Sequence, residues 1–463
     1  MWNKYSKKFL KALPVAGLII FIVLEILSRG AAGIFNKVVA EQKIFRGEVS
    51  VEKISANFLG EVVFTNFVWK DYNGNTMLEI PEGSFKVKIF DIVARNFKTS
   101  TIEEIFVSDA NISLHFDEDM QIDFAPQSYE LKNFSKKPAE KKAPREKKSE
   151  EEMKELGRQR RKIQQEKIES GWKNFNLAGN KIKLNLKLED CRVEIFYRER
   201  HYLFGSVNFE TKIDTDDKMT LDVRTGIFGG TMVGRGMKLN GEIDFKPEIP
   251  ECYFAILFQE VDPSSLGFGL NIHDQMTLSA HFAGSISRPV GIGTLKMREL
   301  HIPGLDFKNV SGNIFYEASM LRFFDVTAEV YGGELEAHGD YNLDTRYYNI
   351  YGDGKKLKTY YALPKSHLHC DIDLNISINS KGNARETVTS GSFSSSKGRY
   401  RVFRIDSISG KFKTEYNSIN FYDVAIDIWN YKISTDALSI VDKKLKLAPI
   451  QITDPTGKVL MTY

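Results

Sequence analysis

Apolar and polar residues alternate along much of the chain after residue 48, and this pattern predicts β-strands with one apolar and one polar face. In the run from Lys181 to Leu188 every second residue is Ile or Leu, and the run from Asp371 to Ile378 has the same pattern. Amphipathic helical patterns are few, which argues against a parallel doubly wound fold. We therefore predict a mainly β protein with an elongated, repeated antiparallel sheet.

Turn signals separate these runs at short intervals. We expect turns at Asn73-Gly74, Asp353-Gly354 and Lys381-Gly382-Asn383.

A longer repeat also follows from the sequence. The segment from Asp222 to Gly230 matches the segment from Asp325 to Gly333, and a third copy starts at Asp423, with Asn430-Tyr431 in place of the glycine pair. The copies recur about every hundred residues, which indicates stacked copies of one multi-strand unit. We expect each glycine pair to turn one strand into the next, because glycine adopts positive φ without strain. The repeat-turn glycines are Gly229, Gly230, Gly332 and Gly333.

The N-terminal residues 1–35 predict a membrane anchor. Four lysines between Lys4 and Lys11 precede an apolar stretch that runs from Ala12 towards Phe35, about the twenty residues that a membrane-spanning helix needs. The lysines place the N-terminus in the cytoplasm and the rest of the chain outside it. A cleaved signal peptide is the alternative, because Gly30-Ala31-Ala32 offers small residues at a cleavage position.

The next boundaries follow from a change in composition. Residues 36–134 form an N-terminal β module, residues 135–172 a Lys-, Glu- and Arg-rich linker or solvated helix, and residues 173–463 the repeated array. The charged segment lacks the apolar residues that a core needs. It is either a tether or surface helix, or a basic arm that rests on anionic lipid headgroups.

Composition and motifs argue against several classes of function. The net charge of +3 gives no general attraction to nucleic acid. The cysteines, Cys191, Cys252 and Cys370, form no C-x-x-C pair, and we expect three buried thiols. On a strand, His367 and His369 share one face while Cys370 points to the other, so these residues predict no metal site. We find no catalytic motif and expect neither an enzyme nor a cofactor.

Several short motifs resemble a known family. They are Phe45 to Val51 directly after the anchor, Phe64 to Trp69, the Asn-Val-Ser-Gly step at Asn309 to Gly312, and the step from Tyr331 to Gly339. With the anchor, they make the chain similar to the AsmA-like and TamB-like envelope proteins of bacteria with two membranes. The charged segment from Ser135 to Glu169 departs from that pattern.

The resemblance implies a fold and a function. The fold would be a curled antiparallel β-groove, anchored in the bacterial inner membrane, with its body in the periplasm. The function would be to bind membrane phospholipids and transfer them towards the outer membrane, in support of envelope biogenesis, with a protein partner in either membrane. The alternative is a scaffold for the assembly of outer-membrane proteins without lipid carriage.

The candidate groove residues are the apolar positions of the two clearest strands. Their pattern fits a lipid-lined groove and the sealed core of a β-sandwich equally well. They are Ile182, Leu184, Leu186, Leu188, Ile372, Leu374, Ile376 and Ile378.

Overall fold

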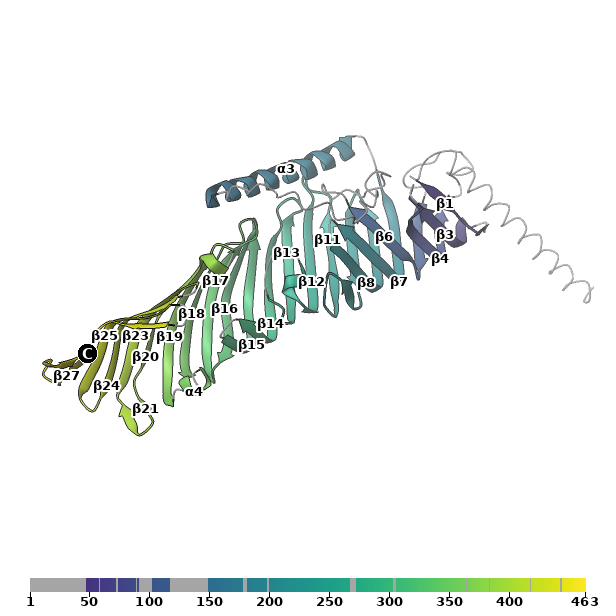
Figure 1. Cartoon of the computed structure of the whole chain (residues 1–463). Helices are drawn as coiled ribbons and strands as arrows, with labels where there is room; N and C mark the ends of the chain where they lie inside the picture. The colour runs from purple at the N-terminus through teal and green to yellow at the C-terminus, as the bar shows by residue number, and fades with distance from the viewer. Residues whose placement is uncertain are drawn as a thin grey trace, which may run out of the picture. The chain divides into compact units, whose positions relative to one another are not determined.

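The computed structural model describes residues 47–463 except 58, 72–73, 89, 91–101, 117–148, 178–180, 198–199, 267–271, 303–304, 363–364, 366, 383, 417 and 442–443. Strands dominate these residues (Figure 1), so the predicted mainly β class is confirmed. The chain divides into two compact units. Unit 1 holds Met1–Arg145 and Trp172–Pro250, and unit 2 holds Glu146–Gly171 and Glu251–Tyr463. The array expected over residues 173–463 thus divides after Pro250.

Unit 1 is a sheet in which most strands pair with their neighbours in sequence. Strand β3 pairs with β1, β2 and β4, and β7 to β9 form a meander that continues into β11. Short β10 continues β9 along the edge of β8. The strands are β1 (Glu48–Ser50), β2 (Lys53–Ala56), β3 (Glu61–Lys70), β4 (Thr76–Val87), β5 (Ile102–Ser108), β6 (Asn111–Phe116), β7 (Lys183–Tyr197), β8 (Arg200–Asp214), β9 (Lys218–Arg224), β10 (Phe228–Gly230) and β11 (Gly236–Asp244).

One junction in unit 1 is parallel, which corrects the expectation of a wholly antiparallel sheet. Strands β5 and β6 both pair antiparallel with β4, and the register is the same for both. On their other side they pair in parallel with β7, where Ile105 lies beside Leu186 and Ile112 beside Val193. A parallel pair requires a long crossover connection. Here the connection runs from residue 117 to residue 182 and includes the charged segment, so the charged segment gives the chain the length to cross over.

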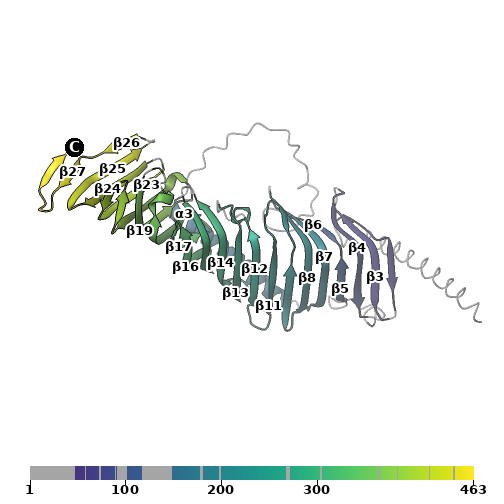
Figure 2. The ribbon, with the colours of Figure 1, turned by 90° about the horizontal axis from the view of Figure 1, so that it is seen from below.

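Unit 2 is also built mainly from hairpins between successive strands, and Figure 2 shows these strands side by side in a single layer. Its strands are β12 (Glu251–Val261), β13 (Met276–Ser285), β14 (Val290–Ile302), β15 (Leu305–Glu317), β16 (Met320–Val330), β17 (Gly333–Asn342), β18 (Tyr348–Lys358), β19 (Leu368–Ser380), β20 (Thr387–Ser395), β21 (Gly398–Tyr400), β22 (Phe403–Ile405), β23 (Ser407–Glu415), β24 (Ser418–Ile428), β25 (Tyr431–Val441), β26 (Lys444–Leu447), β27 (Ile450–Thr453) and β28 (Val459–Thr462). Short helical turns are η1 (Pro263–Leu266), α4 (Thr359–Ala362) and η2 (Ala384–Glu386).

The glycines that were expected to form turns have different roles. Gly332 has φ 66° and forms a two-residue turn with Tyr331 between β16 and β17. Gly230, with φ 72°, ends β10, and a longer loop follows it before β11. Neither Gly229 nor Gly333 has a positive φ.

The predicted turn at Asp353-Gly354 was wrong, because both residues lie within β18. A Cβ atom at Gly354 would lie 2.9 Å from Leu357 Cδ1. Here the glycine makes room for a packed side chain, and the strand continues through a bulge, because the register with β19 shifts between Gly354 and Leu357.

Many strands contain a bulge at a polar residue with positive φ. Asp190 in β7, Asp325 in β16 and Asp423 in β24 have φ near 50°, and the register shifts beside each of them. Asp and Asn tolerate this conformation better than other side chains, and a bulge bends its strand. Two of the repeated aspartates, Asp325 and Asp423, therefore mark bends in their strands.

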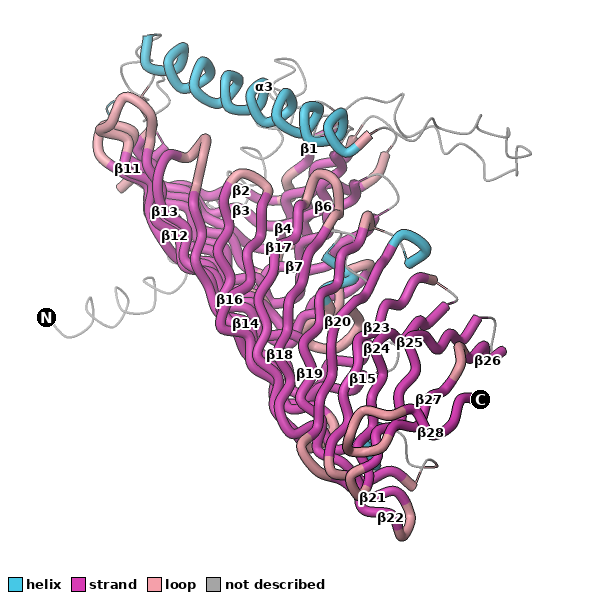
Figure 3. Tube along the Cα trace, turned by 90° about the vertical axis from the view of Figure 1, so that its left-hand side faces the viewer, coloured by secondary structure: helices cyan, strands magenta, loops and turns pink. Residues whose placement is uncertain are grey.

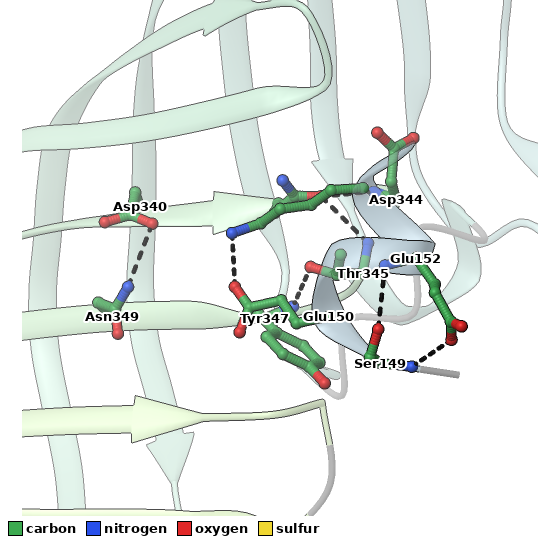
Figure 4. A network of polar contacts seen from close by, with 10 residues as sticks. Ser149, Glu150, Glu152, Asp340, Asp344, Thr345, Tyr347 and Asn349 are labelled. Carbon is green, nitrogen blue, oxygen red and sulfur yellow. Dashed lines mark hydrogen bonds and ion pairs between the residues drawn. The ribbon is translucent and has the colours of Figure 1, made fainter. Parts of the chain in front are cut away.

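The charged segment contains one long helix, α3 (Glu150–Leu177). It begins with a capping box: the backbone N–H of Glu152 donates to Ser149 Oγ at 3.2 Å, and the N–H of Ser149 donates to Glu152 Oε2 at 2.8 Å (Figure 4). In Figures 1 and 3 the helix runs along the edge of the unit 2 sheet where the hairpins turn.

Within unit 2, α3 binds the turns of three hairpins. Arg161 donates to Ser319 Oγ at 2.8 Å in the β15–β16 turn and pairs with Asp344 in the β17–β18 turn. In the β13–β14 turn, Arg288 Nε donates to Gln165 Oε1 at 2.7 Å. The second half of the charged segment is therefore a helix that fastens neighbouring turns together, and not a solvated helix alone.

Candidate functional site

The apolar side of β7 forms a continuous surface with its neighbours in unit 1. Leu184 lies opposite Ile213 of β8 and Leu188 lies opposite Phe209. The row continues into β9, where Met219 faces Ile213 and Val223 faces Phe209. Ile182 precedes the strand, and its backbone N–H donates to Thr215 Oγ1 at 3.0 Å. The unit 1 candidates thus lie on one face, which we call the apolar face of unit 1.

The apolar side of β19 forms a similar surface in unit 2. Ile372, Leu374 and Ile376 lie opposite Leu357, Gly354 and Gly352 of β18. On the other side of β19, Leu374 faces Phe393 of β20 and Ile378 faces Thr389. We call this surface, with its continuation through β23 to β25, the apolar face of unit 2.

All eight candidates have intermediate exposure: none is fully buried and none is exposed. The polar neighbours Lys183, Asn185, Lys187, Asp373 and Asn375 are all exposed on the opposite face. A sealed sandwich core would bury its central side chains almost completely. Among the described residues, the side chains of these faces pack on neighbouring strands of their own sheet, with no second sheet layered over them.

Parts of both faces are nevertheless closed by packing. In unit 1, Leu188 packs against a buried cluster that contains Phe64, Val107 and Cys191. In unit 2, Ile372 and Leu374 pack against a cluster that includes Leu295, Val330 and Leu357. The buried clusters fix the shape of each sheet, and the half-buried side chains extend the apolar surface beyond them.

Phenylalanine rings lie over glycines on the apolar faces. In unit 2 each of β20 and β23 carries a Gly-x-Phe step, and the antiparallel register places Phe393 opposite Gly410 and Phe412 opposite Gly391. A Cβ atom would lie 2.5 Å from Phe393 Cζ at Gly410 and 2.9 Å from Phe412 Cε1 at Gly391. The pair of Phe64 and Gly83 in unit 1 has the same arrangement. Each ring thereby covers the backbone of the neighbouring strand with apolar surface.

The opposite face of unit 1 carries ion pairs between neighbouring strands. Lys183 Nζ lies 3.0 Å from Asp214 Oδ2, and Lys218 Nζ lies 2.8 Å from Glu242 Oε2. The hydrogen bond from Lys183 holds the pKa of the Asp214 carboxyl below its usual value. The sheet of unit 1 therefore has one apolar side and one charged side.

The described residues contain no group of three or more His, Cys, Asp and Glu side chains that could hold a metal ion. His367 and His369 are exposed, whereas Cys370 is buried. The three cysteines are free and buried in β7, β12 and β19, as the sequence predicted, and burial raises the pKa of each thiol. A buried thiol with a raised pKa is a poor nucleophile.

The sequence analysis missed two features. The first is the set of Phe–Gly pairs, which the repeated Gly-x-Phe steps at Gly391 and Gly410 could have indicated. The second is an exposed turn with aromatic and basic residues at Arg399–Arg404, which a search for alternating basic and aromatic residues would have found.

No family model, no curated protein and no solved structure matches this chain. The predicted anchor lies outside the described residues. Within the described part of the chain, no helix has the length and apolar character needed to cross a membrane.

Proposed function

We propose that this protein binds phospholipids on its apolar sheet faces and transfers them towards the outer membrane of a bacterium with two membranes. The observation that supports this proposal is the half-buried state of the eight candidate residues on faces that carry no second sheet among the described residues. Acyl chains can complete such a surface, because each shielded CH₂ group contributes about 0.8 kcal/mol.

The proposal extends to the shape of the sheet and its place in the cell. The bulges at Asp190, Asp325 and Asp423 bend their strands, and we infer that the bent strands curl into an elongated groove with the apolar face inside. The lysine-flanked apolar stretch before residue 36 would hold the chain in the inner membrane, with the groove in the periplasm.

The test is to identify lipids that leave the membrane with the protein. A protease site introduced near residue 40 of the full chain releases the body from membranes without detergent, and mass spectrometry then measures bound lipid. We expect stoichiometric phospholipid on the natural sequence and its loss from Leu184→Asp and Leu374→Asp, because a buried carboxylate opposes acyl-chain binding.

The matched controls place the same charge on the other face of the same strands. Asn185 and Asn379 are exposed neighbours of the candidates in β7 and β19. Asn185→Asp and Asn379→Asp should keep the lipid. A folded body that carries no lipid would refute the proposal and favour the alternative of an assembly scaffold.

A further inference from the structure

One hairpin of unit 2 extends beyond its neighbours. Strands β20 and β21 pair with β23 and β22 in a single register, Gly391 opposite Phe412 and Gly398 opposite Ile405. These four strands therefore form one long hairpin with its turn at Arg401 and Val402. Figures 1 and 3 show this turn at the edge of the sheet away from α3.

The turn of this hairpin exposes apolar side chains. Every residue from Arg399 to Arg404 is exposed, and Val402 has an exposed fraction of 84%. The neighbouring β24–β25 turn adds Trp429, with an exposed fraction of 59%, and its ring lies 5.7 Å from the ring of Phe403. We call this surface the hairpin tip. Its apolar residues are Tyr400, Val402, Phe403, Trp429 and Tyr431.

The backbone holds Trp429 in this exposed position. Trp429 has φ 49° and Asn430 has φ 70°, so the turn between β24 and β25 uses a conformation that bulky side chains rarely adopt. The backbone N–H of Trp429 donates to Asp406 Oδ2 at 3.0 Å, which ties this turn to the start of β23. Trp429 occupies the place in the repeat that Tyr331 has in the preceding copy. The hydrogen bond thus holds the backbone that carries the exposed indole, and the indole ring contacts Phe403.

The charge of the hairpin tip is positive. Arg404 lies 3.6 Å from Asp406, whereas Lys397, Arg399, Arg401 and Lys432 form no ion pair with any described residue. The guanidinium of Arg401 lies over the ring of Tyr400, 5.8 Å from its centroid.

We propose that the hairpin tip docks on an anionic phospholipid membrane, with Val402, Phe403 and Trp429 entering the headgroup region and the basic side chains contacting lipid phosphates. Trp and Tyr favour the boundary between headgroups and acyl chains. Each Lys or Arg near an anionic surface adds to the attraction. This docking stands apart from lipid carriage, because it requires only the tip and not the apolar faces.

The experiment uses the full chain in nanodiscs of phosphatidylcholine, with free vesicles as the target. One set of vesicles is phosphatidylcholine alone, and the other holds phosphatidylcholine and phosphatidylglycerol in equal parts. We expect co-flotation with the mixed vesicles and little with the neutral ones. The double variant Arg399→Glu/Arg401→Glu replaces two positive charges with negative ones and should weaken binding to the mixed vesicles at least about tenfold.

The matched control lies at the other end of β23 and β24. Tyr416 is exposed there, and the Arg385 guanidinium lies 5.6 Å from the centroid of its ring. Arg385→Glu/Tyr416→Ser changes an arginine of η2 and an aromatic residue of the β23–β24 turn, and it should leave vesicle binding unchanged. An equal loss with this control would overturn the proposal, because any change of charge in unit 2 would then suffice.

A second measurement reports insertion directly. In Val402→Cys the new thiol is exposed while the native cysteines are buried, so an environment-sensitive dye attaches at the tip. We expect its emission to shift to the blue with mixed vesicles and to be quenched by lipids that carry nitroxides in the headgroup region. An unchanged emission, or no binding to either kind of vesicle, would overturn the proposal. Lipid content measured on the released body tests lipid carriage separately, so either proposal can fail without the other.

Discussion

Arg161 of α3 pairs with Asp344, a residue in the turn between β17 and β18 that lies far from it in sequence. The same guanidinium donates to Ser319 Oγ in the β15–β16 turn. Gly157, one turn of helix earlier, lets α3 approach the same loop, because a Cβ atom there would lie 2.4 Å from Asp344 Oδ2. One arginine therefore joins the helix to two hairpins of unit 2.

Loss of this arginine should loosen the helix from the sheet. Arg161→Ala removes a charged hydrogen-bond donor from two acceptors, and we expect a cost of about 1 kcal/mol in the local stability of α3. Hydrogen–deuterium exchange across α3 should become about fivefold faster. Arg158→Ala is the control, because Arg158 is largely exposed and, among the residues that the structure describes, pairs only with Glu155 on its own helix. Equal effects of the two substitutions would contradict the assigned role of Arg161.

The Phe–Gly pairs predict a strong dependence on side-chain size. Gly410→Ala should destabilise unit 2 by about 1–3 kcal/mol in denaturant unfolding, because the new methyl group collides with the Phe393 ring. The double variant Gly410→Ala/Phe393→Ala should be less destabilised than the sum of the single variants. Gly171→Ala on α3 is the control, since no atom lies within 4 Å of a Cβ atom there, and it should be neutral or stabilising.

The pair of His301 and Asp274 predicts a pH effect. His301 Nδ1 lies 2.7 Å from Asp274 Oδ1, and the hydrogen bond raises the pKa of the His301 imidazole. Since the folded pKa exceeds the unfolded one, this stabilisation is fully present below the unfolded pKa and is lost as the pH rises through the folded pKa. An NMR titration should show the raised pKa, and Asp274→Asn should remove most of the rise. The Asp306 carboxylate raises the pKa of His301 less than Asp274 does, so Asp306→Asn should lower the His301 pKa much less than Asp274→Asn.

The buried thiols predict slow chemical modification. Cys191, Cys252 and Cys370 should resist a maleimide reagent in the folded protein and react together once the chain unfolds. Gly398 of the long hairpin packs directly on Cys370 Sγ. Rapid labelling of Cys370 alone in the folded protein would therefore mean that this hairpin separates from β19, contrary to the packing.

The sequence predicted the strands well where alternation is strict. The runs at Lys181 and Asp371 became β7 and β19, with their candidate residues together on one face of each strand. Alternation could not distinguish the core of a β-sandwich from a lipid-binding surface, because the same apolar side chains occur in both. In the structure all eight candidates are half-buried, which supports the proposed lipid surface.

Other features depend on contacts that are distant in sequence. Alternating apolar and polar residues are expected in a parallel pair as well as in an antiparallel one, so the pattern of β5 and β6 could not predict their parallel pairing with β7. The glycine in Asp353-Gly354 reads as a turn, but it serves the packing of Leu357. The charges of α3 predicted a helix, whereas its partners, such as Arg288 and Asp344, lie in turns of unit 2 that no local pattern connects with it.

The parallel junction has a consequence for the order in which the chain folds. Most strands pair with the next strand along the chain, so a hairpin can close as soon as its second strand has been synthesised. One edge of β5 and β6 pairs with β4, but the other edge must wait for β7, whose paired residues follow roughly eighty positions later. Closing this large loop carries a greater entropy cost. We therefore expect the junction with β7 to form late and to set the folding rate of unit 1.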